Sequence, residues 1–411
     1  MMSMNAEKVF LEIDRLRDEM IGTFMEFIRV PAIGPENGGD GESKKADKLV
    51  KCLASMGFDR VERHDAPDER VPSKKRPNIL AYTLGENASE TLWIVTHMDV
   101  VPAGEESLWT LTKPFEPIVK DGKVYGRGSE DNMQSMFASI FAVKALKNLR
   151  IKPKRTVALC FVSDEEMGSE YGIRYLIKKG LFRPSDLVVV PDGGNADGSF
   201  IEIAEKSALW FRTRVFGKQT HASMPSKGLN AHRIGMQFAL ALDKMLHEKY
   251  FEKDECFDPP ENTFEPTKKE KNVDAVNIVP GEDVTYFDCR ILPTYDVKKV
   301  FEDIEDTAKD FERKTGAKIS IEIIHESTAP KPTPANARAV TMLEQALKQV
   351  RGIRPIIGGI GGGTCAAYFR EVNIPAVVWS TVDETAHQPN EYAKIENLLN
   401  DAKIFAYLAT N

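Results

Sequence analysis

Four short and almost continuous apolar runs constrain the fold of this chain more than any other feature of its sequence. These runs are Leu92–Val95, Val157–Val162, Leu187–Val190 and Ala376–Trp379. Strands that are apolar at nearly every position are typical of a parallel sheet whose two faces are both covered by helices. Helical patterns lie between some of the runs, at Met133–Leu149 and Ile173–Lys179. We therefore predict an α/β fold with a mostly parallel sheet and helices on both faces.

Two further helices are expected ahead of the first run. Apolar side chains recur at helical spacing over residues 7–28, and a second helical pattern covers Lys44–Met56. The polar, glycine-rich segment Glu36–Ser43 between them predicts a loop.

The middle of the chain follows a different order of strands and helices. The patterns predict a strand, a helix, two strands, a helix and a strand, at Ser207–Phe216, Asn230–Tyr250, Val273–Val279, Asp283–Leu292, Val297–Lys314 and Lys318–His325. This β-α-β-β-α-β order is that of a ferredoxin-like unit. Because patterns of the first kind resume at Asn336, the unit is interpreted as an insert. We expect a catalytic domain of residues 1–206 and 327–411, interrupted by a lid of residues 207–326.

Length and charge exclude several classes of protein. At 411 residues the chain is longer than one typical domain, which agrees with two domains. A net charge of −7 disfavours nucleic acid as a partner, since an acidic surface repels phosphate backbones. No apolar run approaches the roughly 20 residues that span a bilayer, and residues 1–14 lack the pattern of a secretion signal. The five cysteines are scattered without a CxxC pair, so we expect a reducing, cytoplasmic location.

Imidazole and carboxylate side chains follow each of the four apolar runs. The segments are Thr96–Asp99, Ser163–Glu166, Asp192 and Asp383–His387, and a fifth group, Gly126–Asp131, precedes a predicted helix. In open α/β sheets, ligands bind beyond the carboxyl ends of the strands, so these side chains should meet at one edge. Nitrogen and oxygen ligands suit zinc and its neighbours. Two metal ions roughly 3.5–4 Å apart need a shared carboxylate and separate ligands, which five residues can supply: His97, Asp131, Glu166, Asp192 and His387.

Two neighbouring acids extend this candidate site. Asp99 lies two residues after His97, so on a strand the two side chains face the same way, and the carboxylate could hold the other imidazole nitrogen. Adjacent Glu165 and Glu166 could divide two tasks, with one binding metal and the other moving protons. Each motif alone is common, because paired glutamates usually form a solvated surface and a lone histidine such as His387 is usually polar surface or core. The combination, with each group just after a buried strand, predicts a metal centre.

Taken in order, these motifs resemble those of a metallohydrolase family that includes succinyl-diaminopimelate desuccinylase, acetylornithine deacetylase, aminoacylase, carnosine-type dipeptidases and glutamate carboxypeptidase. The resemblance covers nearly the whole chain. It rests on residues 96–102, 126–131 and 164–169, on Asp192, on Gly217–Pro225 with His221, on Asn277 and Arg290, and on His387 with Asn390 and Glu391.

The resemblance implies a role for each ligand of the metal centre. His97 and Asp192 would hold one metal ion, and Glu166 and His387 would hold the other. Asp131 would bridge the two ions, with an unusual cis peptide bond to the next residue. The expected cofactors are two divalent ions, zinc in the first place, with cobalt or manganese as alternatives.

The resemblance also implies roles outside the ligand set. Glu165 would be the general base, and Asp99 would orient His97. The insert would be a lid that also forms a homodimer, and His221 would reach the partner's active site and stabilise the oxyanion. A free carboxylate on a small substrate would be bound by Asn277, Arg290, Gly362, Gly363 and Thr364.

The substrate stays open because the chain departs from many relatives beside the metal ligands. Asn132–Gln134 follows the bridging position, and Cys365–Ala367 follows the glycine loop. Three functions remain: hydrolysis of an N-succinyl or N-acetyl amino acid, a dipeptidase or carboxypeptidase with the same centre, and an inactive homologue that acts as a binding protein. The intact ligand set and Glu165 argue against the third. The glycine run 358–363 lacks the P-loop and GxGxxG patterns, so no nucleotide is expected.

Overall fold

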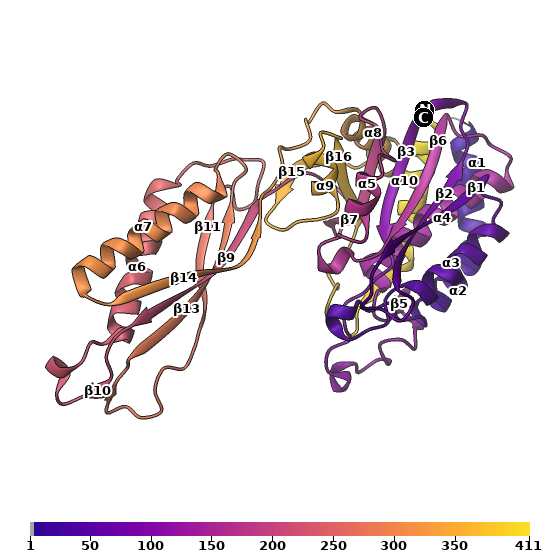
Figure 1. Ribbon diagram of the computed structural model, residues 1–411. Coiled ribbons are helices and arrows are strands. Elements are labelled where there is room, and N and C mark those ends of the chain that lie inside the picture. Colours follow the sequence, from indigo (N-terminus) through magenta and orange to yellow (C-terminus); the bar gives the residue numbers. More distant parts are fainter. Residues whose placement is uncertain (1–3) are drawn as a thin grey trace. The chain divides into compact units, whose positions relative to one another are not determined.

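The computed structural model describes residues 4–411 and divides into two compact units (Figure 1). The first unit comprises the residues up to Ile203 together with Thr333–Ile357 and Thr364–Asn411. The second comprises Ala204–Pro332 and the glycine run Gly358–Gly363. The second unit therefore starts a few residues before the expected insert of residues 207–326, ends a few residues after it, and gains a short segment from the later chain.

The large sheet of the first unit has four parallel strands at its centre and an antiparallel pairing on either side of them. Its strand order is β1-β2-β6-β3-β7-β16-β8-β15. Strand β3 pairs in parallel with β6 and β7, and β7 pairs in parallel with β16, whereas β1 runs antiparallel to β2, β2 to β6, and β8 to β16. The bounds are Arg60–Pro67 (β1), Lys75–Thr83 (β2), Asn87–His97 (β3), Arg155–Val162 (β6), Leu187–Asn195 (β7), Phe200–Glu205 (β8), Ile356–Ile360 (β15) and Ala376–Thr381 (β16). The four apolar runs are the four central strands, so that prediction is confirmed.

Helices cover both faces of this sheet. On one face, Phe369 of α9 and Ile173 of α5 pack in a buried cluster with Trp93 and other central-strand residues. On the other face, Trp379 of β16 meets Phe405 of α10 at 6.0 Å between ring centroids. Helix α10 in turn packs on α1, α4 and α8, and α3 lies beside α2. The bounds are Met4–Arg15 (α1), Arg17–Ile28 (α2), Ser43–Ser55 (α3), Ser135–Asn148 (α4), Ile173–Lys178 (α5), Arg338–Ala346 (α8), Ala366–Glu371 (α9) and Ile395–Thr410 (α10).

One helical prediction in this unit needs correction, and another is confirmed with slightly different bounds. The single helix predicted over residues 7–28 is two helices, α1 and α2, which meet at Leu16. Both keep an apolar face on the core, so hydrophobic spacing alone does not reveal the break. The helix predicted over Met133–Leu149 is observed as α4, and the kinked turn Ser129–Gln134 before it has non-helical backbone angles at Asp131 and Asn132. This turn directs Asp131 out of the helical register.

The second unit is a four-stranded antiparallel sheet with two helices. Its strand order is β11-β13-β9-β14, and Figure 1 shows α6 and α7 along it. The bounds are Ser207–Phe216 (β9), Ala231–Lys249 (α6), Thr263–Lys269 (β11), Glu282–Ile291 (β13), Val297–Thr315 (α7) and Lys318–Ser327 (β14). The chain order β-α-β-β-α-β is therefore the predicted one. Phe211 and Phe287 stack at its core with centroids 4.9 Å apart.

One predicted strand of the second unit is wrong. The second strand of the sheet is Thr263–Lys269, not Val273–Val279. Only Ile278–Val279 (β12) is regular there, and it pairs with Thr220–His221 (β10) in a separate ladder. The pattern misleads because β11 has a single buried apolar side chain, Phe264, whereas Val276 is fully exposed in a loop. Among the described residues, no helix is both long enough and apolar enough to cross a membrane.

Candidate metal centre

The predicted ligands come together at the carboxyl ends of the central strands of the first unit. His97 ends β3, Asp192 lies in β7, and Glu166 lies in the short turn Glu165–Met167 after β6. Ligand atoms of His97, Asp131 and Glu166 lie within 4.8 Å of one another. Ligand atoms of His97, Glu165 and Asp192 do the same. His97 therefore belongs to both groups of potential donors, and the two groups lie next to each other.

Asp131 lies between two histidines and directs one carboxylate oxygen at each. Its Oδ1 lies 2.8 Å from Nε2 of His97, and its Oδ2 lies 3.0 Å from Nε2 of His387. Asp192 Oδ1 lies 3.3 Å from the same nitrogen of His97, and Glu166 Oε2 lies 3.1 Å from that of His387. The arrangement has two halves that share one carboxylate. This is the pairing that the family resemblance implies.

The residue after Asp131 also takes part in the site. The peptide bond between Asp131 and Asn132 is cis, as the resemblance implies. The Asn132 side-chain amide donates to Asp192 Oδ1 at 2.7 Å and to the carbonyl of Pro191 at 2.8 Å. Asn132 therefore fixes the orientation of Asp192, a contact that the sequence showed only as a departure from relatives.

The donor set fits two divalent cations. Glu166 Oε1 is buried and has no hydrogen-bond partner, so one lone pair of a carboxylate is left for a ligand. Burial and the nearby charge of Asp131 raise the pKa of Glu166 to about 7. Burial and the charge of Asp192 raise the pKa of Glu165 well above its usual range. Crowded, buried carboxylates of this kind are stabilised in the charged form by bound cations.

The two histidines respond to the same negative charge. Hydrogen bonds to Asp131 and Glu166 raise the pKa of His387 to about 10. Burial opposes protonation of His97, but the charges of Asp192 and Asp131 raise its pKa well above the usual range. A metal ligand must be a neutral imidazole, so metal ions and protons compete for both side chains.

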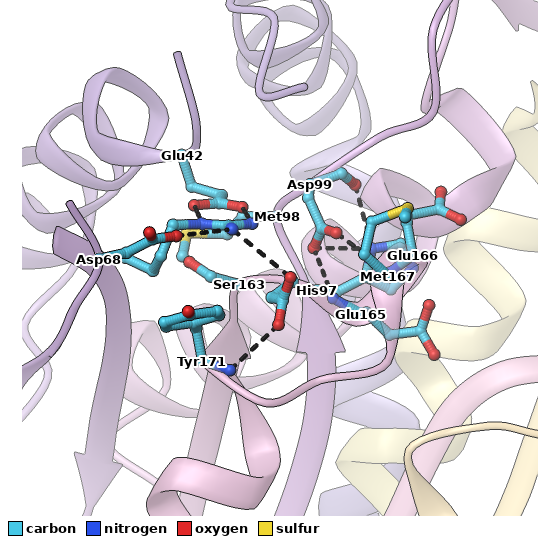
Figure 2. A network of polar contacts seen from close by, with 12 residues as sticks. Glu42, Asp68, His97, Met98, Asp99, Ser163, Glu165, Glu166, Met167 and Tyr171 are labelled. Atoms are coloured by element: carbon cyan, nitrogen blue, oxygen red, sulfur yellow. Dashed lines mark hydrogen bonds and ion pairs between the residues drawn. The ribbon is translucent and has the colours of Figure 1, made fainter. Parts of the chain in front are cut away.

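Asp99 acts mainly on the turn that carries the two glutamates. The expected contact of its carboxylate with the ring of His97 is long, at 3.6 Å from Nδ1, whereas the Asp99 backbone carbonyl lies 3.0 Å from that nitrogen. The carboxylate oxygens accept from the backbone N–H groups of Glu165 and Glu166 at 3.2 and 3.1 Å (Figure 2). One residue thus orients the imidazole through its main chain and the glutamate turn through its side chain.

A buried ion network holds the same turn from the other side. Arg76 is fully buried and donates from Nε to Glu42 Oε2 at 2.7 Å, and its Nη1 lies 3.4 Å from Asp164 Oδ1. Asp164 Oδ2 accepts from the backbone N–H of Tyr171 at 3.0 Å. Figure 2 shows Glu42 and Tyr171 in this network beside the glutamate turn. Sequence patterns gave no sign of Arg76, because in a sequence a buried charged residue of a strand cannot be distinguished from an exposed one.

The second unit holds two separate groups of predicted substrate residues. His221 and Asn277 are neighbours, since β10 pairs with β12 and the backbone N–H of Ala222 donates to the Asn277 carbonyl at 2.9 Å. Arg290 lies near the C-terminal end of β13, whereas β12 immediately precedes the N-terminal end of that strand. Its Nε and Nη2 donate to Asp288 at 2.7 and 3.0 Å, and its Nη1 donates to the Gly361 carbonyl at 2.9 Å.

The remaining predicted substrate residues follow Gly361 in the chain. Gly362 and Gly363 end the second unit's glycine segment, and Thr364 begins the returning part of the first unit. Next to Thr364, the buried Cys365 places Sγ 3.9 Å from Glu165 Oε1. The sequence gave no role to this thiol.

Fold and site together define a metal-dependent hydrolase that acts on amide or peptide bonds. The model of the peptidase family M20/M25/M40 matches residues 93–411, and the chain belongs to this family. An uncharacterized metallohydrolase of Methanocaldococcus jannaschii is 40% identical over 405 residues, which cover 95% of this chain and 98% of that protein.

Two other similar proteins have named activities. A succinyl-diaminopimelate desuccinylase of Nitratiruptor is 27% identical over 386 residues, covering 92% of this chain and 96% of that protein. The solved structure of a tripeptidase from Staphylococcus aureus has a TM-score of 0.74 at 19% identity, covering 96% of this chain and 97% of that one. At this identity the structural likeness establishes the fold.

The buried network generates a stability prediction. Arg76→Ala should destabilise the chain by about 3–5 kcal/mol, because it leaves the charge of Glu42 buried without its partner. Arg29→Ala is the control, because the side chains of Arg29 and its partner Glu26 are 45% and 57% exposed and their pair should contribute at most about 1 kcal/mol. Urea unfolding followed by circular dichroism measures both. Equal losses in the two variants would show that the network is not a structural support.

Proposed function

We propose that this protein uses a dinuclear metal centre to hydrolyse the amide bond of a small N-acylated amino acid, as a deacylase like succinyl-diaminopimelate desuccinylase or acetylornithine deacetylase. The observation that carries the proposal is Asp131, whose two carboxylate oxygens face different histidines. His97 with Asp192 would hold one ion, and His387 with Glu166 would hold the other. Nitrogen and oxygen donors accept zinc, cobalt and manganese, and zinc is the proposed native ion.

Glu165 is the proposed general base. Two divalent ions bound here would supply a water that ionises near neutral pH instead of at about 15.7. The Glu165 carboxylate lies with His97 and Asp192 at one half of the centre and is not needed as a ligand in either pair. Burial raises its pKa well above the usual range, which suits a group that takes a proton from water and returns it to the leaving amine.

Hydrolysis of peptides is the alternative within the same chemistry. A dipeptidase or carboxypeptidase would use the same centre, and the structural likeness to a tripeptidase keeps this reading open. The name of the Nitratiruptor relative favours the deacylase, because that protein matches over most of both chains. An inactive binding protein is disfavoured, because every predicted ligand and Glu165 are present. We propose a cytoplasmic location for the enzyme.

The second unit supports a homodimer in which sites are shared. Arg290 lies eight residues along β13 from Glu282, the strand end nearest His221 and Asn277, which is about 27 Å at the usual rise of a strand. One small carboxylate cannot contact both ends. We propose that Arg290 and the glycine loop bind the substrate of their own subunit. His221 and Asn277 reach the partner's site, where His221 stabilises the oxyanion.

Exposed apolar residues on an edge strand agree with this dimer. Strand β14 is an edge of the second unit's sheet, and Ile323 and Ile324 on it are 38% and 48% exposed. An unpaired edge with exposed apolar residues is a surface on which a second chain can pair. The proposed lid is therefore also the proposed dimerisation unit.

The metal centre generates a paired prediction. Glu165→Gln should keep two bound ions but lose kcat by several orders of magnitude, because it removes the base and no ligand. Glu166→Gln, a matched change one residue away, should lose one ion, because it removes a ligand. Metal content by mass spectrometry and steady-state kinetics measure the two effects. Full activity of Glu165→Gln, or two ions in Glu166→Gln, would refute the respective assignment.

Shared sites generate a complementation prediction. Mixing His221→Ala subunits with Glu165→Gln subunits should restore about a quarter of normal activity, since half of the dimers are mixed and each has one complete site. Asn277→Ala should complement Glu165→Gln in the same way. Arg290→Ala should not, because it acts in its own subunit. The activity of the unseparated mixture gives the measurement, two affinity tags show that mixed dimers form, and recovery with Arg290→Ala would contradict the assignment.

A substrate panel separates the two hydrolase readings. We expect N-succinyl or N-acetyl amino acids to be hydrolysed with a higher kcat/KM than dipeptides, in the presence of zinc, cobalt or manganese. Arg290 retains two of its five N–H donors for a substrate carboxylate. Amidation of that carboxylate should therefore raise KM. A preference for dipeptides would favour the exopeptidase.

A further inference from the structure

A small three-stranded ladder places two segments of the metal centre side by side. Strand β5 (Lys123–Tyr125) pairs with β17 (Tyr392–Lys394), and Tyr125 lies opposite Tyr392. The segment Gly126–Asp131, here called the bridging loop, leaves β5 and carries Asp131. The segment Asp383–Glu391, here called the histidine loop, leads into β17 and carries His387. The two loops are about 250 residues apart in sequence, yet the ladder brings them together.

The histidine loop gives one carboxylate to the bridging loop. Glu391 is fully buried, and its Oε1 accepts from the backbone N–H groups of Glu130 and Asp131 at 2.9 and 3.1 Å. Its Oε2 accepts from the backbone N–H of Gly128 at 2.9 Å and from Arg127 Nη1 at 2.6 Å. The Glu391 carboxylate thus accepts hydrogen bonds from three backbone N–H groups of the bridging loop, and the last of these belongs to Asp131.

The bridging loop gives a carboxylate in return. Glu130 is buried, and its Oε1 accepts from the backbone N–H of Asp383 at 2.6 Å. Its Oε2 accepts from the backbone N–H of Thr385, from the Thr385 hydroxyl at 3.0 Å, and from the backbone N–H of Ala386 at 3.1 Å. Ala386 precedes His387 directly. The backbone next to His387 is therefore hydrogen-bonded to the side chain of Glu130, the residue before Asp131.

We propose that Glu130 and Glu391 are positioning residues that set the two halves of the metal centre, each by binding the backbone amides of the other's loop. This inference rests on the proposed function, because it assigns the residues to a dinuclear site. Neither carboxylate contacts the ligand atoms. Both act on the main chain of a ligand, as Asp99 does on the turn of Glu165 and Glu166.

The exchange predicts an asymmetry between the two glutamates. Glu130 binds the backbone of the histidine loop. His387 in that loop would bind one ion only, and it would share that ion with Glu166. Glu391 holds the loop of Asp131, the carboxylate shared by both halves. Loss of Glu130 should therefore weaken one metal position, whereas loss of Glu391 should weaken both. A support that was merely structural would lower the stability of the chain without dividing the two positions in this way.

Calorimetric titration of the metal-free, full-length chain with zinc tests this asymmetry. In Glu130→Gln, one of the two dissociation constants should rise by about tenfold or more, since backbone amides lose a charged acceptor, and the other should stay near its normal value. In Glu391→Gln, both should rise. Glu130→Asp is the second variant for the first position: it keeps the charge but shortens the reach, and the same single rise is expected.

Glu90→Gln is the matched control. Glu90 is a buried glutamate of the same unit that pairs with Arg155 and Arg338 and contacts neither loop. It should lower thermal stability while leaving both dissociation constants unchanged. Unchanged zinc binding in both Glu130 variants, or equal weakening of both positions by Glu130→Gln, would overturn the inference. If the unsubstituted protein bound no zinc, that result would overturn the proposed function and the inference that rests on it.

Discussion

The site depends on one carboxylate held between two imidazoles. Asp131 faces His97 with one oxygen and His387 with the other, at 2.8 and 3.0 Å. A displacement of this residue alters both halves of the centre together. Its backbone is accordingly not left to a regular helix: Gly128 is left-handed, Asp131 has φ −114° and ψ 92°, and α4 begins only at Ser135. The regular helix therefore begins only after Asp131, the residue that both halves of the proposed metal centre share.

Around this carboxylate the protein stabilises buried negative charge mainly with backbone amides. Asp99, Glu130 and Glu391 each accept from two or more N–H groups of the loops that carry ligands. Backbone amides are fixed dipoles that lower the cost of burying a carboxylate without neutralising it. The charge of Glu166, Asp131 and Asp192 is thus left for cations to balance. Two buried guanidinium groups add positive charge: Arg76 Nη1 lies 3.4 Å from Asp164 Oδ1, and Arg127 Nη1 donates to Glu391 Oε2 at 2.6 Å.

Much of the fold and the ligand set follows from the sequence, because both rest on local patterns. A strand buried on both faces is apolar at nearly every position, so the four central strands were predictable, and four of the five proposed ligands follow or end these strands. The fifth, Asp131, follows β5 of the small ladder. Strand β11 was not, since it buries only Phe264. The break at Leu16 leaves the apolar spacing intact on both sides. The carboxylate exchange of Glu130 and Glu391 joins two loops that are far apart in sequence, and a side chain hydrogen-bonded to distant main chain leaves no periodic signal.

The division into two units explains why family membership identifies the type of reaction but not the substrate. All proposed ligands and Glu165 lie in the first unit, on strand ends whose positions the sheet fixes. Most of the proposed substrate residues lie in the second unit, where their spacing follows from the length of β13 and not from the metal centre. Arg290 is already held by Asp288 and Gly361, so its free N–H groups point in a fixed direction. The proposed substrate residues can therefore change while the proposed hydrolytic centre stays the same, so membership of the family identifies the type of reaction but not the substrate.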